Sequence, residues 1–147
     1  MIKAVIIASS PTFKKFILIK KIAINGFGRI GRAALKVIMD THGLEIVAIN
    51  DLLSIENAAY LLKYDSVYGR FDQEVHVHNG HLQIGDREIT YLSEKDPSDL
   101  PWKDLDVEIV IESTGFFTTA KMLKNTSMQE RSMLLFLVLR KVKIPQL

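Results

Sequence analysis

The sequence is most informative first through what it lacks. It has no cysteine, which excludes disulfides, zinc–thiolate sites and thiol catalysis within the chain and fits a reducing compartment such as the cytoplasm. Its net charge is only +2, with acidic and basic residues interspersed, which argues against binding to nucleic acid. No apolar run approaches the ~18–20 residues that a membrane-spanning helix needs. What remains is a chain of 147 residues, 48% of them hydrophobic, which is enough for one globular domain.

The first 18 residues stand apart from the motifs that follow. Their apolar stretch Ala4–Ala8 is shorter than the roughly 7–15 residues of a signal-peptide core, and Pro11 and Lys14 interrupt what comes next. We expect residues 1–18 to be a leader or the result of a mis-assigned start. A start codon at Leu18, read as methionine, is the specific hypothesis, and the mass of the natural protein would test it.

The next part of the chain has the pattern of a strand–helix–strand unit. Phe16–Ile24 is apolar and β-branched, which predicts a buried strand. Arg29–Asp40 has apolar residues at helical spacing and is followed by Gly43, which suits a helix end. Leu44–Asn50 predicts a second apolar strand. A unit of this length implies parallel strands joined by a right-handed crossover.

Further elements complete an α/β pattern. Ser54 opens a second helical segment, and Glu74–Ile84 alternates around Asn79-Gly80, a strong hairpin signal. Arg87–Leu92 and Asp106–Ser113 predict further strands. The predicted fold is therefore a Rossmann-type, doubly wound, mostly parallel sheet with an antiparallel hairpin insertion.

A three-glycine motif, Gly26-x-Gly28-x-x-Gly31, lies between the first predicted strand and helix. In a dinucleotide site the first glycine permits a tight turn, the second lets the backbone approach the pyrophosphate, and the third lets helix and strand pack closely. Asp51 follows Gly31 by 20 residues and can accept hydrogen bonds from the adenosine ribose. Its charge would repel a 2′-phosphate, so the motif favours NAD over NADP. A glycine turn without a ligand is the alternative interpretation.

Other candidate chemistry is weak. His76, His78 and His81 lie close together on the predicted hairpin, but no carboxylate or cysteine spacing completes a metal site, so we expect an exposed hairpin face and no metal. No serine has a nucleophile-elbow pattern, and no histidine follows His81. The chain therefore offers a dinucleotide half-site without an evident catalytic half.

Several segments in order resemble one family. KIAINGFGRIGR, VAINDL, AAYLLKYDSVYGRF, SEKDPSDLPW and VIESTGFFTTA are similar to the N-terminal NAD-binding domain of phosphorylating glyceraldehyde-3-phosphate dehydrogenase, from Lys21 to about Lys121. The resemblance implies a glycolytic, homotetrameric enzyme that acts on glyceraldehyde 3-phosphate and phosphate. It also implies a catalytic cysteine and a general-base histidine that these 147 residues do not contain.

The resemblance also implies roles for individual residues. Asn25–Gly31 would hold the pyrophosphate, with Arg29 and Ile30 at backbone contacts, and Asp51 would hold the ribose. Lys95 would lie near the adenine, and Ser113 to Gly115 would close the strand beside the cofactor. The expected cofactor site is thus Asn25, Gly26, Phe27, Gly28, Arg29, Ile30, Gly31, Asp51, Lys95, Ser113, Thr114 and Gly115.

The resemblance stops at about Lys121. One adenine deleted from the codons for Ala120 and Lys121 would convert a family-like Ala-Lys-Asp-Ala-Glu-Lys into the Ala-Lys-Met-Leu-Lys-Asn found here. We therefore expect an NAD-binding domain at residues 19–121, an out-of-frame tail at 122–147, a sheet incomplete at its C-terminal end, and no catalytic domain. The apolar run Met133–Leu139 would either dock as a replacement strand or promote aggregation.

Three alternatives to an inactive NAD-binding fragment stay open at this point. The sequence is an incomplete record of a full-length active dehydrogenase, it is a non-enzymatic interaction protein, or it is the product of a decayed gene. The downstream reading frame separates the first of these from the rest.

Overall fold

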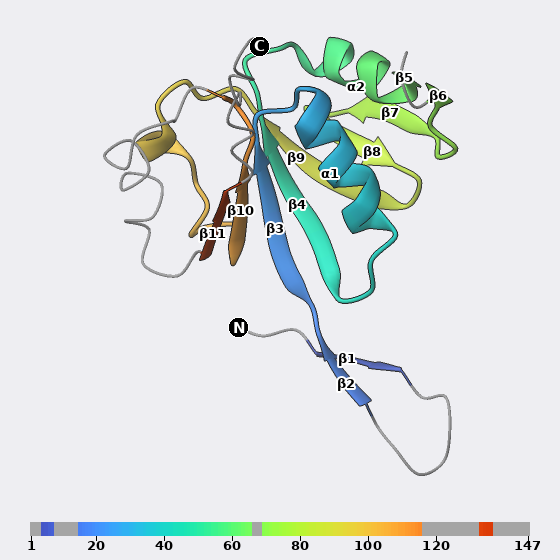
Figure 1. The fold of residues 1–147 in the computed structure, drawn as a ribbon, viewed down its shortest axis with the longest axis vertical. Coiled ribbons are helices and arrows are strands. Elements are labelled where there is room, and N and C mark those ends of the chain that lie inside the picture. The colour runs from blue at the N-terminus through green and yellow to red at the C-terminus, as the bar shows by residue number, and fades with distance from the viewer. Residues whose placement is uncertain (1–3, 8–14, 66–68, 116–132, 137–147) are drawn as a thin grey trace, which may run out of the picture.

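A computed structural model describes residues 4–7, 15–65, 69–115 and 133–136 (Figure 1). Within these ranges, a seven-stranded sheet has the order β11-β10-β3-β4-β9-β8-β7. Two helices, α1 and α2, and a short 3-10 helix, η1, accompany it. The bounds in this sheet are β3 Lys20–Asn25, α1 Arg29–Met39, β4 Leu44–Asn50, α2 Ile55–Lys63, β7 Val75–His78, β8 His81–Ile84, β9 Arg87–Leu92, η1 Pro97–Asp99, β10 Ile109–Glu112 and β11 Met133–Phe136.

The strand order confirms a doubly wound, mostly parallel sheet. β3, β4 and β9 lie side by side and run parallel, so the chain first builds the sheet outward in one direction. It then returns to pair β10 with the opposite edge of β3, again in parallel. The direction of building therefore reverses at β3. Ligands of open α/β sheets bind outside the carboxyl ends of the strands at such a reversal.

The antiparallel insertion is also confirmed. β7 pairs with β8, and β8 pairs with β9, in antiparallel register. The turn between β7 and β8 has positive φ at both Asn79 (49°) and Gly80 (75°), as a two-residue hairpin turn of the primed type requires. Helix α2 also begins as predicted, because the Ser54 side chain accepts a hydrogen bond from the Asn57 N–H.

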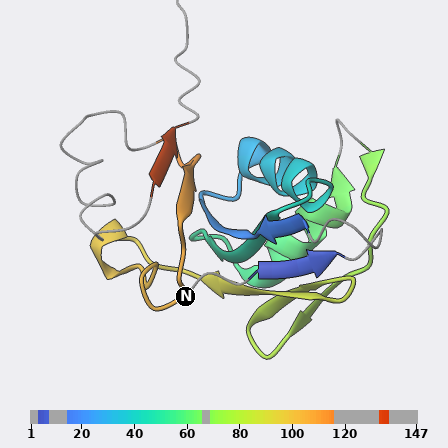
Figure 2. The same ribbon diagram turned by 90° about the horizontal axis from the view of Figure 1, so that it is seen from below.

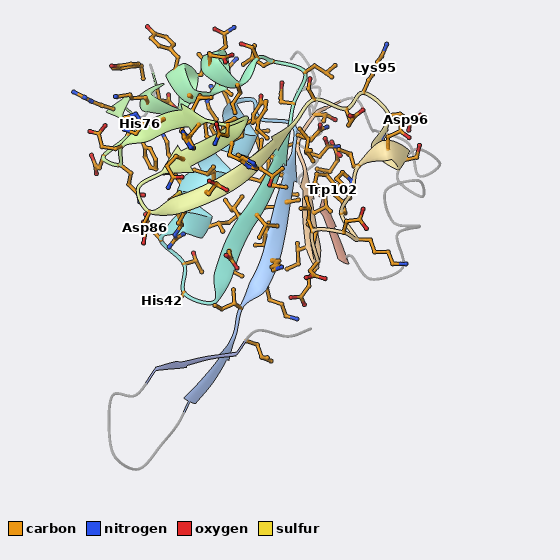
Figure 3. The ribbon with its side chains drawn as sticks, turned by 180° about the vertical axis from the view of Figure 1, so that it is seen from behind. His42, His76, Asp86, Lys95, Asp96 and Trp102 are labelled. Atoms are coloured by element: carbon orange, nitrogen blue, oxygen red, sulfur yellow. The ribbon has the colours of Figure 1, made fainter. Side chains whose placement is uncertain are left out.

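Each face of the sheet has its own apolar core. Helix α1 lies in front of the sheet beside β4 (Figure 1), and its Leu35 packs with Ile24 and with Leu62 of α2 in one buried cluster. On the other face, the segment between β9 and β10 supplies Trp102, which is fully buried among small strand residues including Ala23 (Figure 3). The crossover from β9 to β10 thus covers the face that α1 and α2 leave open.

Two predicted strands were longer than the observed ones. Phe16–Ile24 is not one strand: β2 (Lys15–Leu18) pairs with β1 (Ala4–Ile7), and β3 begins separately at Lys20. The β1–β2 hairpin extends from the lower end of β3 and pairs with no other described strand (Figures 1 and 2). Strand β10 begins at Ile109 rather than Asp106, because Asp106 has a φ of 54° and ends a turn closed by the Val107 N–H donating to the Trp102 carbonyl.

Part of the apolar run near the C-terminus joins the sheet as a strand. Met133–Phe136 forms β11, which pairs with β10 in parallel. The rest of the predicted out-of-frame tail, residues 122–132 and 137–147, lies outside the described residues, as does most of the predicted leader. A small two-stranded sheet, β5 (Tyr64–Asp65) and β6 (Gly69–Arg70), follows α2. None of the described helices has the length and apolar character needed to cross a membrane.

Candidate functional site

Four parallel strands end in one row at the carboxyl edge of the sheet. Glu112 at the end of β10 pairs in register with Asn25, Asn25 pairs with Asn50, and Asn50 pairs with Leu92. The loops that leave this row carry the residues predicted from the sequence. Residues 25–31, 51, 95 and 113–115 therefore all lie at or just after the carboxyl ends of these strands, around the point where the sheet reverses its direction of building.

Two of the three glycines are needed by the backbone itself. Gly26 has a φ of +95°, and a Cβ atom on it would lie 2.5 Å from the Thr114 nitrogen. A Cβ atom on Gly31 would lie 2.1 Å from the Gly26 carbonyl oxygen. Any larger residue would force the glycine turn away from β10 or from helix α1. These contacts account for the tight turn and the close helix–strand packing that the motif predicts.

Gly28 differs from the other two glycines, because the surrounding protein would accommodate a side chain at this position. Its φ is −72°, and a Cβ atom would meet no atom within 4 Å. It is the N-cap of α1, yet no side chain caps the helix and no acidic residue lies in the first turn. The first N–H groups of a helix lack intrahelical acceptors and carry the positive end of its dipole. The exposed start of α1 is therefore suited to an anionic group such as a pyrophosphate.

Asp51 links the glycine turn to the loop after β4. Its Oδ2 accepts a hydrogen bond from the Phe27 N–H at 2.6 Å, and its Oδ1 accepts one from the Leu53 N–H at 2.8 Å. A carboxylate has about four acceptor positions, so each oxygen can still accept from a hydroxyl group. The side chain is half-buried. Asp51 is thus held beside the uncapped start of α1, and both of its carboxylate oxygens can accept a further hydrogen bond.

Tyr91 supports the same loop from β9. Its hydroxyl donates to the Leu53 carbonyl at 2.9 Å. Burial raises the pKa of Tyr91 well above its usual value, and the nearby carboxylates of Asp51 and Glu56 raise it further. The tyrosine therefore remains a neutral hydrogen-bond donor that holds the loop carrying Asp51.

The segment after β10 closes the other side of the turn. The Ser113 hydroxyl donates to the Gly26 carbonyl at 2.6 Å, and the Ser113 N–H donates to the Asn25 carbonyl at 2.8 Å. The Thr114 N–H donates to Glu112 at 2.9 Å. Gly115 is exposed and has a φ of 73°. Ser113 and Thr114 thus contact the glycine turn directly.

Lys95 reaches the same edge without joining these contacts. The loop that carries it is attached to β4, because the Glu94 N–H donates to the Asn50 Oδ1 atom at 2.8 Å. The Lys95 side chain is exposed and points away from the sheet (Figure 3). Asp96 then begins η1 by accepting from Ser98, and these hydrogen bonds lower the pKa of Asp96.

Three buried polar residues lie beneath the turn, and the sequence analysis missed two of them, Asn50 and Glu112. Asn25, Asn50 and Glu112 are each no more than 5% exposed, although they sit among apolar neighbours. The Asn25 Nδ2 atom donates to Glu112 at 2.7 Å, and the Asn50 Nδ2 atom donates to Asn25 at 2.8 Å. Asn25 was predicted as part of the site, but its side chain faces inward. A polar residue at the last position of each apolar strand was the available signal.

The histidines lie away from this edge. His76 and His78 are on β7, the outer strand of the sheet, and His81 begins β8. His76 is 3.5 Å from the Glu74 carboxylate on the exposed surface (Figure 3). No group of three metal-ligating side chains occurs within the part of the chain that the structure describes. A pocket of about 310 Å³, lined by residues that include Lys63, Arg70 and Glu74, involves none of the predicted site residues.

Comparison with known proteins identifies a family over most of the chain. Residues 20–120 match a family described as glyceraldehyde 3-phosphate dehydrogenase, NAD binding domain. The chain is 53% identical over 98 residues to glyceraldehyde-3-phosphate dehydrogenase of Clostridium acetobutylicum, and 50% identical over 99 residues to that of Shimwellia blattae. These matches cover 67% of this chain, but only 29% and 30% of those relatives.

Proposed function

Because this chain belongs to the glyceraldehyde 3-phosphate dehydrogenase family through its NAD-binding domain, we propose that it binds NAD at the carboxyl edge of β10, β3, β4 and β9. The turn of residues 25–31 holds the pyrophosphate, chiefly through the backbone of Arg29 and Ile30. Asp51 binds the adenosine ribose, Lys95 lies beside the adenine, and residues 113–115 flank the rest of the cofactor.

One observation carries this proposal. The hydrogen bond from the Phe27 N–H to Asp51, at 2.6 Å, places a carboxylate directly beside the uncapped start of α1. A dinucleotide needs both features at once, since its pyrophosphate is anionic while its ribose hydroxyls are hydrogen-bond donors. A structural glycine turn alone would need neither.

We also propose that the site prefers NAD to NADP. A 2′-phosphate on the adenosine ribose would approach the Asp51 carboxylate and be repelled by it. The two residues that follow, Leu52 and Leu53, supply no compensating cation, and Leu52 is 61% exposed. The carboxylate thus recognises the hydroxyl form of the cofactor and disfavours the phosphorylated form.

Calorimetric titration of the 147-residue chain with NAD and NADP tests both proposals. We expect NAD to bind about tenfold or more tightly than NADP, which corresponds to ~1.4 kcal/mol of charge repulsion. Asp51→Asn should reduce this ratio. Asp86→Asn is the matched control, because Asp86 is exposed in the turn between β8 and β9 (Figure 3) and should leave the ratio unchanged. Equal affinities in the unmodified chain would refute the preference, and no binding of either would refute the site.

The activity of the family's whole protein is a further proposal. We propose that, in a longer family member, this domain presents NAD for the oxidation and phosphorylation of glyceraldehyde 3-phosphate, in a cytoplasmic homotetramer. In that chemistry a cysteine thiolate attacks the aldehyde, hydride passes to NAD, and phosphate releases the acyl group. The 147 residues contain no cysteine, so they supply the NAD half of the site alone.

We propose in addition that residues from about 122 onward are translated out of frame. The support is the match between one deleted adenine and the residues that follow Lys121. Sequencing the gene across codons 120 and 121 tests this directly. One additional adenine would restore a family-like frame, whereas its absence would leave the tail as it stands.

A further inference from the structure

Three buried side chains at the ends of β10, β3 and β4 form one hydrogen-bonded row with the backbone of Glu94, which follows β9. Glu112 accepts from the Thr114 N–H at 2.9 Å and from the Asn25 amide at 2.7 Å. Asn25 in turn accepts from the Asn50 amide at 2.8 Å. The Asn50 oxygen accepts from the Glu94 N–H at 2.8 Å, and its amide nitrogen also donates to the Glu94 carbonyl at 3.0 Å. At one end of the row, Glu112 also accepts from the Thr114 hydroxyl. At the other end, the N–H and the carbonyl of Glu94 both hold the Asn50 amide.

The Thr114 N–H on one side and the Asn50 amide, held by Glu94, on the other are both donors with fixed directions, so the row between them needs one member that only accepts. Each asparagine amide offers its oxygen as an acceptor to one neighbour in the row and its nitrogen as a donor to the other. Two amides in series therefore do not change the number of donors relative to acceptors. The Glu112 carboxylate, with acceptors on both sides, supplies the missing acceptor. It thereby fixes which way the Asn25 amide points, whereas the N–H and the carbonyl of Glu94 fix the Asn50 amide. An amide at position 112 would leave two donors facing each other somewhere in the row.

The row also controls the position of the glycine turn. Asn25 immediately precedes Gly26, and the Gly26 N–H donates to the Asn50 carbonyl at 2.8 Å. Thr114, held by Glu112, packs so closely on Gly26 that a Cβ atom there would lie 2.5 Å from the Thr114 nitrogen. A shift in Asn25 or Thr114 would therefore move the turn that leads to α1.

We propose that Glu112 is a positioning residue, whose carboxylate orients Asn25 and holds the glycine turn in its NAD-binding shape. This inference rests on the NAD binding proposed above. Glu112 itself is 4% exposed and lies beneath the turn, so it acts through the backbone of Gly26 and Thr114 rather than by touching the cofactor.

The test moves the carboxylate from one member of the row to its neighbour. In Glu112→Gln alone, the new amide N–H group faces the amide N–H group of Asn25. In Asn25→Asp alone, the new carboxylate faces the Glu112 carboxylate. The double variant Glu112→Gln/Asn25→Asp restores one acceptor-only group, and every member of the row again has a partner. In each single variant the free protein relieves the conflict by shifting the turn, and NAD must reverse that shift on binding.

We expect each single variant to bind NAD about tenfold more weakly, because a buried polar group left without a hydrogen-bond partner typically has an effect of this size. The double variant should return to within about twofold of the unmodified chain, the scatter usual for such comparisons. Glu88→Gln, the same substitution at an exposed position on β9, is the control and should bind NAD normally. A double variant no better than the worse single variant, or a Glu112→Gln variant with unchanged affinity, would overturn the proposal.

Amide hydrogen exchange measured without NAD separates this inference from the proposed function. The Gly26 and Thr114 amides should exchange faster in both single variants and recover in the double variant. The Ile89 amide of β9 should be little changed throughout. Failure of the unmodified chain to bind NAD, with this exchange pattern intact, would refute the proposed function while the row still positions the turn. Uniformly faster exchange at all three amides would instead overturn the positioning role.

Discussion

Single residues of the glycine motif differ in what they tolerate. Gly31→Ala places a Cβ atom 2.1 Å from the Gly26 carbonyl oxygen, so the helix must move away from the turn. We expect the free energy of unfolding to fall by about 1–3 kcal/mol, although alanine is intrinsically favoured in a helix by about 1 kcal/mol. Chemical denaturation followed by circular dichroism measures the loss. An unchanged denaturation midpoint would show that α1 and β3 can separate without penalty.

Gly28→Asp should weaken NAD binding without lowering the stability of the domain. The backbone at Gly28 suits any residue, and aspartate is a better N-cap than glycine by a few tenths of a kcal/mol, so stability should be kept or slightly raised. The new carboxylate would occupy the helix start and repel a pyrophosphate, weakening NAD binding by about tenfold or more. Calorimetry and denaturation on the same sample measure the two effects. Normal NAD affinity in a stable Gly28→Asp variant would place the pyrophosphate elsewhere.

Tyr91 gives a prediction for alkaline pH. Its pKa is raised in the folded protein above the usual value near 10, so above that pH the unfolded chain releases a proton that the folded chain retains. The free energy of unfolding should therefore fall as the pH rises past about 10. Tyr91→Phe removes this contribution, at a cost of about 1 kcal/mol at neutral pH from the lost hydrogen bond to Leu53. Denaturation at several pH values compares the two proteins, and parallel curves would contradict the assignment.

At the scale of elements, the sequence predicted correctly those features that depend only on residues close together in the chain. The Ser54 cap, the Asn79-Gly80 turn and the bounds of β4 needed no distant contact, and all are confirmed. The start of β3 was wrong, because the apolar pattern of residues 16–24 continues across the break at Ile19. The break depends on β2 pairing with β1, which no periodicity within 16–24 encodes.

The same distinction applies to the site. The glycine motif and Asp51 could be placed from spacing because the motif itself defines a strand, a turn and a helix. The buried row could not, since Glu112 and Asn25 are separated by 87 positions and meet only through the return of the chain to β3. Sequence spacing identifies a local turn, whereas a row across four strands requires the topology.

The β1–β2 hairpin yields a prediction at this scale. It pairs with no other described strand, Leu18 is 51% exposed, and an isolated two-stranded hairpin is marginally stable in water. Deletion of residues 1–18 should therefore change the free energy of unfolding by no more than about 0.5 kcal/mol. Denaturation of the shortened chain beside the full chain measures this. A substantially larger loss would show that the hairpin contributes to the domain.

At the scale of the whole molecule, the chain is expected to bind NAD without catalysing the oxidation of an aldehyde. We propose that the glycine turn, Asp51 and the row beneath them form a cofactor site, but the 147 residues include no cysteine to form a covalent intermediate with an aldehyde. The purified 147-residue chain, given NAD, glyceraldehyde 3-phosphate and phosphate, should produce no NADH while still binding NAD. An intact member of the family, assayed in parallel, shows that the reagents are active. Production of NADH that persists through further purification would mean that another group replaces the thiolate. Loss of that activity on purification would assign it to a co-purifying enzyme.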